Sequence, residues 1–127
     1  MNIKILLVDD EQDFLEQSKL LGEKTGEGAK VDITTDPEVA LNEAVEKDYD
    51  AVVADYHMPE MDGLELLEML RERGDNTPFI ILTGKGGEEV AIKALNLKVD
   101  GYIRKGSDPK KQFKSIVDTI FNRPVST

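Results

Sequence analysis

Ala51-Val52-Val53-Ala54-Asp55 is the stretch that decides the fold of this chain. Four apolar residues in a row, followed at once by a carboxylate, are typical of a strand buried on both faces at the centre of a parallel sheet. A loop from Tyr56 to Met61 comes next, and Asp62-Gly63-Leu64-Glu65 resembles the capping box that opens a helix. The stretch therefore predicts a strand, a loop and a helix of a doubly wound α/β protein.

The same alternation continues on both sides of this stretch. Runs typical of strands lie at Ile3 to Val8, Lys30 to Thr34, Phe79 to Leu82 and Gly101 to Arg104. Helical patterns lie at about Glu11 to Lys24, from Asp36-Pro37, after Asp62, at about Glu88 to Asn96 and from Asp108-Pro109. The second strand run alternates apolar and polar residues, which indicates a sheet edge.

The first predicted helix has Phe14, Leu15, Ser18 and Leu21 on one face, and two further helices show a clear apolar face. The predicted faces are Pro37, Ala40, Leu41, Ala44 and Val45 in the second helix, and Phe113, Ile116, Val117, Ile120 and Phe121 in the last. Five strands that alternate with five such helices predict the doubly wound α/β class.

Length and composition bound the function. We expect one folded domain over residues 1–123 and a short tail at 124–127. The 26 acidic and 16 basic residues give a net charge of −10, which disfavours direct binding to nucleic acid and to anionic membranes. The absence of cysteine excludes disulfides, thiolate metal sites and cysteine nucleophiles. No signal-peptide layout and no apolar stretch near about 20 residues is present, so we expect a cytoplasmic protein.

Polar residues stand where the strands end: Asp9, Asp10, Asp55, Thr83 and Lys105. The carboxyl ends of parallel strands meet at one sheet edge, so these side chains should gather there. Two carboxylates 4 Å apart repel by about 1 kcal/mol in water and by about 4 kcal/mol at an effective dielectric of 20. A bound cation relieves this repulsion, and all-oxygen ligands favour Mg²⁺ over Ca²⁺. Alternatively, the first two aspartates merely cap the first helix.

Asp55 has a second possible role, because a carboxylate beside Mg²⁺ can act as a nucleophile and form an aspartyl phosphate. Phosphoryl transfer requires positive charge and hydrogen-bond donors around the phosphoryl oxygens. Lys105 and the cation supply the charge, while Thr83 and backbone N–H groups near Gly84 can donate. Gly84 has no side chain, which leaves room for a bulky group above Asp55.

These residues, in this order, resemble the receiver domain of two-component response regulators, as in chemotaxis response regulators. The motif comprises an acidic pair, a strand-end aspartate, a strand-end threonine followed by a small residue, and a lysine three after a tyrosine. The strongest single match is Asp55-Tyr56-His57-Met58-Pro59-Glu60-Met61-Asp62-Gly63. The resemblance covers essentially the whole chain and implies a flavodoxin-like (βα)5 sandwich with a parallel sheet of order 2-1-3-4-5.

The resemblance also implies a donor and a metal site. Asp55 would accept a phosphoryl group from a phosphohistidine on a sensor histidine kinase or phosphotransfer protein. Asp10, Asp55 and the backbone carbonyl of His57 would ligate Mg²⁺, with Asp9 helping directly or through water. Lys105 would pair with the phosphoryl group.

The implied output is a conformational switch rather than an enzyme for another substrate. Thr83 would move towards the phosphoryl group, and Tyr102 would turn inward behind it. This change would alter the surface of the fourth helix, fifth strand and fifth helix, where a downstream protein would bind. Dimerisation on activation through this surface stays open, and the protein would catalyse only its own phosphorylation and dephosphorylation.

Gly106 departs from the family, which usually has a cis proline after the lysine. A non-proline cis bond costs about 2.5–4 kcal/mol, so we expect a trans bond or a rearranged loop. Such lysine-glycine variants hint at an archaeal receiver or one attached to a sensor kinase. The change also keeps a phosphorylation-independent scaffold open as an alternative.

His57 and Lys85 lie at positions that influence phosphoryl lifetime in receivers, and we hypothesise that they control water access to Asp55. We favour an exposed loop side chain for His57 over a catalytic base. A phosphatase that uses an aspartyl phosphate is a weaker alternative, because it needs an aspartate where His57 stands. A flavodoxin-like cofactor binder is weaker still, because Asp9-Asp10-Glu11 would repel a cofactor phosphate.

Overall fold

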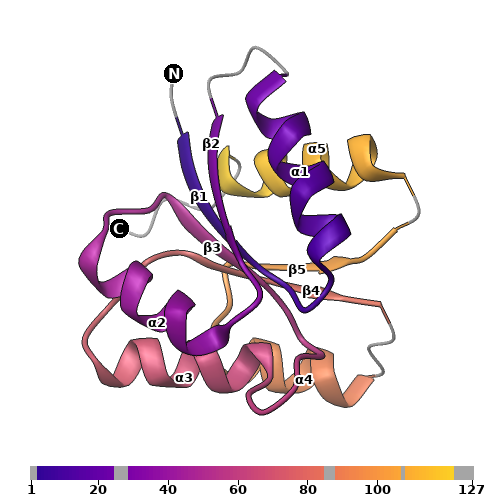
Figure 1. The fold of residues 1–127 in the computed structure, drawn as a ribbon. Coiled ribbons are helices and arrows are strands. Elements are labelled where there is room, and N and C mark those ends of the chain that lie inside the picture. The colour runs from indigo at the N-terminus through magenta and orange to yellow at the C-terminus, as the bar shows by residue number, and fades with distance from the viewer. Residues whose placement is uncertain (1–2, 25–28, 85–87, 107, 122–127) are drawn as a thin grey trace.

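The computed structural model describes residues 3–24, 29–84, 88–106 and 108–121. Strands and helices alternate strictly through this part of the chain (Figure 1). The strands are β1 (Ile3–Val8), β2 (Ala29–Thr34), β3 (Ala51–Asp55), β4 (Phe79–Thr83) and β5 (Gly101–Arg104). The helices are α1 (Gln12–Lys24), α2 (Pro37–Glu46), α3 (Gly63–Glu72), α4 (Glu88–Asn96) and α5 (Pro109–Phe121).

The strands form one parallel sheet of order β2-β1-β3-β4-β5, which confirms the predicted class and strand order. β3 and β4 lie inside the sheet, and every residue of both strands is buried. β2 lies at an edge, and its buried residues are Ala29 and Val31. β3 and β4 each extend one residue beyond the predicted run, so Asp55 and Thr83 belong to the sheet itself.

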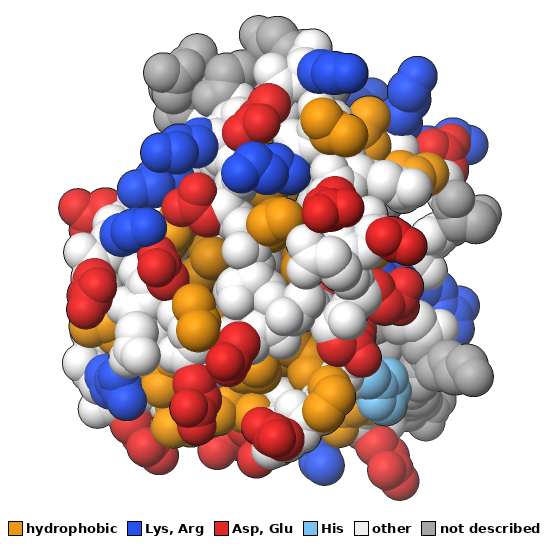
Figure 2. Space-filling view, viewed as in Figure 1, with side chains coloured by type: hydrophobic (Ala, Val, Ile, Leu, Met, Phe, Trp, Pro, Cys, Tyr) orange, Lys and Arg blue, Asp and Glu red, His pale blue; other side chains and the backbone are white. Residues whose placement is uncertain are grey.

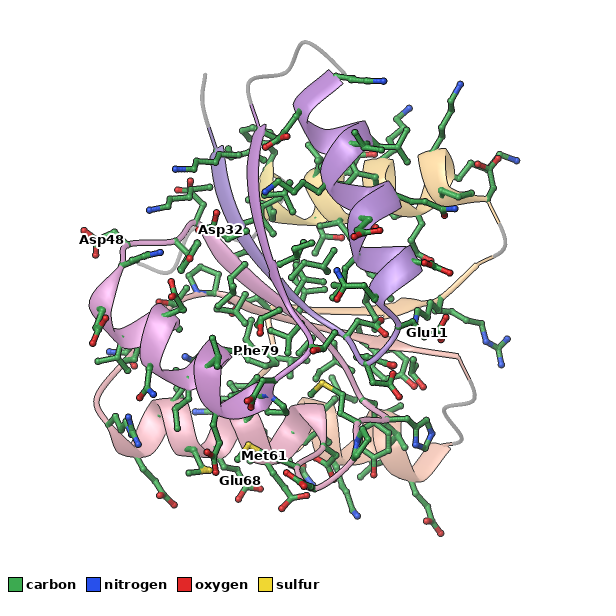
Figure 3. All side chains as sticks on the ribbon, viewed as in Figure 1. Glu11, Asp32, Asp48, Met61, Glu68 and Phe79 are labelled. Atoms are coloured by element: carbon green, nitrogen blue, oxygen red, sulfur yellow. The ribbon has the colours of Figure 1, made fainter. Side chains whose placement is uncertain are left out.

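Helices cover both faces of the sheet, α1 and α5 on one side and α2, α3 and α4 on the other (Figure 1). Two hydrophobic cores correspond to these two sides, because successive strand residues point to opposite faces. In β4, for example, Phe79 belongs to the core under α2 and α3 (Figure 3), whereas Ile80 belongs to the core under α1 and α5. This alternation sets the side of the sheet on which each polar strand-end residue emerges.

Local side-chain chemistry fixes the helix starts. The Asp62 carboxylate accepts a hydrogen bond from the backbone N–H of Glu65 at 2.8 Å, and the Glu65 side chain accepts one from the Asp62 N–H at 3.2 Å. Asp36 caps α2 by accepting from the N–H of Glu38, with Pro37 at the first helical position. Both predicted helix starts are therefore confirmed.

Two residues of the predicted apolar faces are exposed. Val45 is 45% exposed near the end of α2, and Phe121 is 49% exposed as the last residue of α5. None of the helices in the described residues is long and apolar enough to cross a membrane.

Gly63, the first residue of α3, provides a test of how this helix packs against the end of β3. A Cβ added at Gly63 would lie 2.6 Å from the backbone carbonyl oxygen of Asp55, whereas a Cβ at Gly84 would meet nothing within 4 Å. We expect Gly63→Ala to lower the free energy of unfolding by about 1–3 kcal/mol because the backbone must shift. The matched variant Gly84→Ala should leave it nearly unchanged. Urea unfolding measures both, and equal losses would contradict this packing.

Candidate functional site: an acidic pocket at the carboxyl edge of the sheet

The polar strand-end residues emerge from neighbouring strands at one edge of the sheet. Leu7 of β1, Val53 of β3 and Ile103 of β5 all belong to the core under α1 and α5. Asp9, Asp55 and Lys105 each follow one of these core residues by two positions. Because every second residue of a strand points to the same face, the three polar side chains should emerge on the side of α1 and α5.

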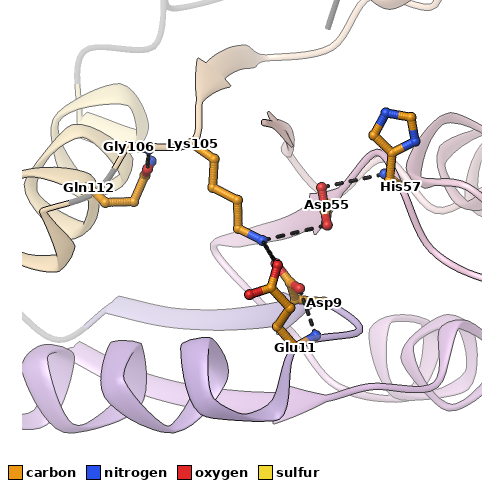
Figure 4. A network of polar contacts seen from close by, with 7 residues as sticks. All are labelled: Asp9, Glu11, Asp55, His57, Lys105, Gly106 and Gln112. Atoms are coloured by element: carbon orange, nitrogen blue, oxygen red, sulfur yellow. Dashed lines mark hydrogen bonds and ion pairs between the residues drawn. The ribbon is translucent and has the colours of Figure 1, made fainter. Parts of the chain in front are cut away.

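Lys105 connects these carboxylates (Figure 4). Its Nζ atom lies 2.7 Å from Asp9 Oδ2 and 3.6 Å from Asp55 Oδ2. The exposed fractions of the side chains are 13% for Lys105, 0% for Asp9 and 7% for Asp55, so the ion pair is nearly removed from water. Glu11 approaches the same Nζ at 3.4 Å from the exposed rim.

Asp9, Asp10 and Asp55 form the acidic pocket. Each offers a carboxylate oxygen, and these oxygens all lie within 4.8 Å of one another. Asp9 and Asp55 are buried, whereas Asp10 is exposed at the mouth. An all-oxygen group of this kind fits a hard divalent cation. The prediction that these three aspartates lie together and could hold a metal ion is therefore confirmed.

Asp9 also contributes to the start of α1. Its Oδ1 atom accepts a hydrogen bond from the backbone N–H of Glu11 at 2.9 Å. The alternative in which this residue merely caps the first helix is therefore wrong for Asp9, because its second oxygen is the one paired with Lys105.

The electrostatics of the pocket follow from burial. Burial raises the pKa of Asp9 to about 6, although Lys105 and the Glu11 N–H act in the opposite direction. Burial also raises the pKa of Asp55 against the influence of Lys105. For Lys105, burial lowers the pKa, but Asp9, Asp55 and Glu11 outweigh it and the pKa is raised overall. The lysine is therefore firmly charged, while its two buried partners hold their negative charge at a cost.

Thr83 and Gly84 stand at the end of β4, next to Asp55 in the sheet. Asp55 is in register with Leu82, and the N–H of Tyr56 donates to the Leu82 carbonyl at 2.8 Å. Thr83 is 1% exposed, and its Oγ1 has no hydrogen-bond partner in the described part of the chain. Gly84 is exposed with open space where a side chain would stand. A buried hydroxyl without a partner among the described residues has unused donor capacity at this end of β4.

Tyr102 lies on β5, paired in register with Ile81, and is 37% exposed. Ile81 belongs to the core under α2, α3 and α4, and strand alternation places Thr83 and Tyr102 on that same side of the sheet. The two predicted switch residues thus share one side, opposite the pocket.

His57 is exposed, as the pale blue side chain in Figure 2 shows. Its backbone N–H donates to Asp55 Oδ1 at 3.4 Å, and its ring packs edge-to-face on Tyr56. The expected loop position is confirmed. Lys85, its predicted partner in controlling water access, lies outside the described residues.

Three site contacts were not identified from the sequence. The Lys105 Nζ lies 4.4 Å from the centre of the Phe14 ring, Glu11 reaches the same ammonium, and Gln112 accepts a hydrogen bond from Gly106. Phe14 appears in the sequence only as a packing residue of a helix, and Gln112 carries no motif. The run of Asp9, Asp10 and Glu11 was the one signal available for Glu11.

Fold and site together define a (βα)5 protein with an acidic pocket and a partly buried lysine at the carboxyl edge of its sheet. The family model described as "Response regulator receiver domain" matches residues 5–117. The chain therefore belongs to this family. Response regulator SaeR of Staphylococcus aureus is 36% identical over 107 residues, covering 84% of this chain and 46% of that protein. The chain thus spans about half the length of the curated relatives it matches.

Solved structures agree with this assignment. A CheY-like receiver domain protein from Methanospirillum hungatei JF-1 superposes with a TM-score of 0.83 at 26% identity and covers 97% of both chains. The receiver domain of Francisella response regulator 1452 has a TM-score of 0.82 at 28% identity, covering 97% of this chain and 100% of that one.

The raised pKa of Asp9 predicts a pH-dependent penalty in the metal-free protein. Its folded pKa of about 6 exceeds the ordinary value of 3.8 for an aspartate, so the penalty is absent below pH 3.8 and grows as the pH rises to about 6. A shift of this size corresponds to a cost on the order of 2–3 kcal/mol. Part of the gain on removing the charge is offset by the lost partner of Lys105.

We therefore expect Asp9→Asn, in a chelator at pH 7.5, to unfold at higher urea concentration than the wild type. The difference should close as the pH falls towards 4. Asp10→Asn removes an exposed carboxylate from the same pocket and should give a smaller change. A wild-type protein more stable than Asp9→Asn at every pH would contradict the buried-charge argument.

Proposed function

We propose that this chain is a phosphorylation-dependent switch in which Asp55 accepts a phosphoryl group. Receiver domains are signalling switches rather than classical enzymes, and the chain belongs to that family. One observation carries the proposal: a buried carboxylate, Asp55, with the Lys105 ammonium at 3.6 Å and two further carboxylates within 4.8 Å. The resemblance to SaeR extends over only part of that protein, so kinase, output and pathway are proposals as well.

In the proposed reaction an Asp55 carboxylate oxygen attacks the phosphorus of a phosphohistidine on a histidine kinase or phosphotransfer protein. The new oxygen–phosphorus bond forms as the phosphorus–nitrogen bond breaks, and the imidazole leaves with the bonding electron pair and takes up a proton. The raised pKa of Lys105 keeps its ammonium charged, so it can balance the charge of the phosphoryl oxygens. The unpartnered Thr83 hydroxyl and the backbone N–H of Gly84 would donate hydrogen bonds to those oxygens.

The donor set fits Mg²⁺. Asp10, Asp55 and the backbone carbonyl of His57 would hold the ion, with Asp9 helping directly or through water. When bound, Mg²⁺ supplies positive charge to the transferring phosphoryl oxygens. The chain's own contribution is to hold these oxygens close together at a cost that is already visible in the raised pKa values of Asp9 and Asp55.

The proposed output passes through Thr83 and Tyr102 to the surface of α4, β5 and α5. Four large apolar side chains are exposed on these elements: Ile92, Leu95, Tyr102 and Phe121. A downstream protein would bind this surface, and dimerisation of the active state through it stays a prediction. The domain limits at residues 1–123 with a tail at 124–127, and the cytoplasmic location, also stay predictions.

The direct test is the intact mass of the protein after incubation with acetyl phosphate and Mg²⁺. We expect one phosphoryl adduct on the wild type, none on Asp55→Asn, and none when a chelator replaces Mg²⁺. Asp55→Asn keeps the size of the side chain and removes its nucleophilic charge. No adduct from acetyl phosphate or from a phosphorylated histidine kinase would favour the scaffold function instead.

Thr83→Val should separate phosphoryl acceptance from switching. Valine keeps the shape and removes a buried hydroxyl that has no hydrogen-bond partner within the described residues, so the variant should be as stable as the wild type or slightly more so. We expect it to form the adduct but to leave the Tyr102 ring in its unphosphorylated environment, as followed by NMR. Thr83→Ser, which keeps the hydroxyl, is the matched control. A normal Tyr102 response in Thr83→Val would contradict the proposed switch.

A further inference from the structure

Gln112 is a buried polar residue without an assigned role. Five polar or charged side chains are buried in the described residues: Asp9, Ser18, Asp55, Thr83 and Gln112. Three of them form the pocket and its neighbour on β4. Gln112 is only 5% exposed although it lies in the first turns of α5, among the residues that face β5 and α1. Burying an amide is costly unless its polar atoms have partners, so its place requires an explanation.

The side chain of Gln112 forms a hydrogen bond with Gly106, the residue after Lys105. The backbone N–H of Gly106 donates to Gln112 Oε1 (Figure 4), while Nε2 has no hydrogen-bond partner in the described part of the chain. The carbonyl side of the amide is therefore what fixes this residue. The Lys105–Gly106 peptide is trans, since the described residues contain no cis bond. A proline at position 106 would have no N–H to donate.

This bond completes the anchoring of the segment that carries Lys105. On one side, the N–H of Lys105 donates to the carbonyl of Thr83 at 2.8 Å. On the other side, the N–H of Gly106 is bound to Gln112, whose own N–H donates to the Asp108 carbonyl at 3.0 Å within the first turn of α5. Lys105 is thus tied to β4 through one amide and to α5 through the next.

We propose that Gln112 is a positioning residue for phosphoryl acceptance. By holding the N–H of Gly106 it fixes the backbone direction from which Lys105 reaches Asp9 and Asp55. This role rests on the proposed function of Asp55. It also explains how a trans glycine can serve at a position where the family usually has a cis proline.

Two variants remove the bond from opposite ends. Gln112→Met has a similar length and no acceptor, and Gly106→Pro has no donor and leaves the buried glutamine in place. Two matched controls keep the bond. Gln112→Glu retains an acceptor oxygen, and Gly106→Ala retains the N–H, with its added Cβ at an ordinary 3.8 Å from Gln112 Oε1.

The first readout needs no phosphorylation. Exchange of the Gly106 amide hydrogen in Gln112→Met should be about ten-fold faster than in the wild type. The Lys105 ε-methylene protons should also lose the ring-current shift caused by Phe14, whose ring lies 4.4 Å from Nζ. Gln112→Glu should keep both signals. An unchanged Lys105 shift in both Gln112→Met and Gly106→Pro would overturn the proposal.

The second readout is the rate of adduct formation with acetyl phosphate and Mg²⁺. We expect a fall of about five-fold in Gln112→Met and in Gly106→Pro, with no further fall in the double variant because one hydrogen bond is lost in each case. Gly106→Ala and Gln112→Glu should react at rates close to wild type. Normal rates in both bond-breaking variants would overturn the proposal. No adduct on the wild type would instead refute the proposed function, while the amide exchange and Lys105 shift would still decide the role of Gln112.

Discussion

The ion pair between Lys105 and Asp9 is the interaction around which the site is arranged. It lies almost entirely out of water, with Nζ 2.7 Å from Oδ2, and it attracts Asp55 and Glu11 as well. A single ammonium does not offset the cost of burying these carboxylates: burial is the main cause that raises the pKa values of Asp9 and Asp55, and repulsion between the carboxylates adds a smaller part. Removing Lys105 would leave the buried carboxylates without their positive partner and would be strongly destabilising, whereas Lys105 keeps Asp55 and Glu11 nearby when Asp9 loses its charge. The pocket is therefore held in a state whose energy falls when further positive charge arrives.

The apolar core around the sheet provides the free energy of folding that offsets the cost of burying these charges. Every residue of β3 and β4 is buried, and apolar side chains cover both of their faces. Each buried aliphatic or aromatic side chain contributes about 1.5–3 kcal/mol, so a few such residues offset the strain of one charged pocket. Parallel strands place their carboxyl ends together, and the charges thus collect at an edge without interrupting the core.

The sequence was sufficient for the fold and for the members of the pocket, and for a physical reason. Apolar runs, helix caps and strand ends are local patterns, and a parallel sheet converts strand-end position into proximity. The sequence alone therefore predicts that the side chains of Asp9, Asp55 and Lys105 lie close together. The contacts of Phe14 and Gln112 depend instead on how α1 and α5 are placed over the sheet, which no local pattern specifies. The exposure of Val45 and Phe121 is likewise a property of the packed structure that the helical periodicity does not specify.

The charged residues of the site and the two proposed switch residues lie on opposite sides of the sheet. The charged groups Asp9, Asp55 and Lys105 emerge on the side of α1 and α5, whereas Thr83 and Tyr102 belong to the side of α4. In the proposed switch, a group bound at Asp55 would influence α4 across the strand ends that separate the two sides. The end of β4 is one such connection, because the Thr83 hydroxyl has no hydrogen-bond partner among the described residues and the Thr83 carbonyl accepts the N–H of Lys105. The backbone of Thr83 thus contacts the charged side of the sheet, and its side chain lies on the opposite side. This arrangement suits the end of β4 to connect the pocket with the exposed surface of α4, β5 and α5 in the proposed switch.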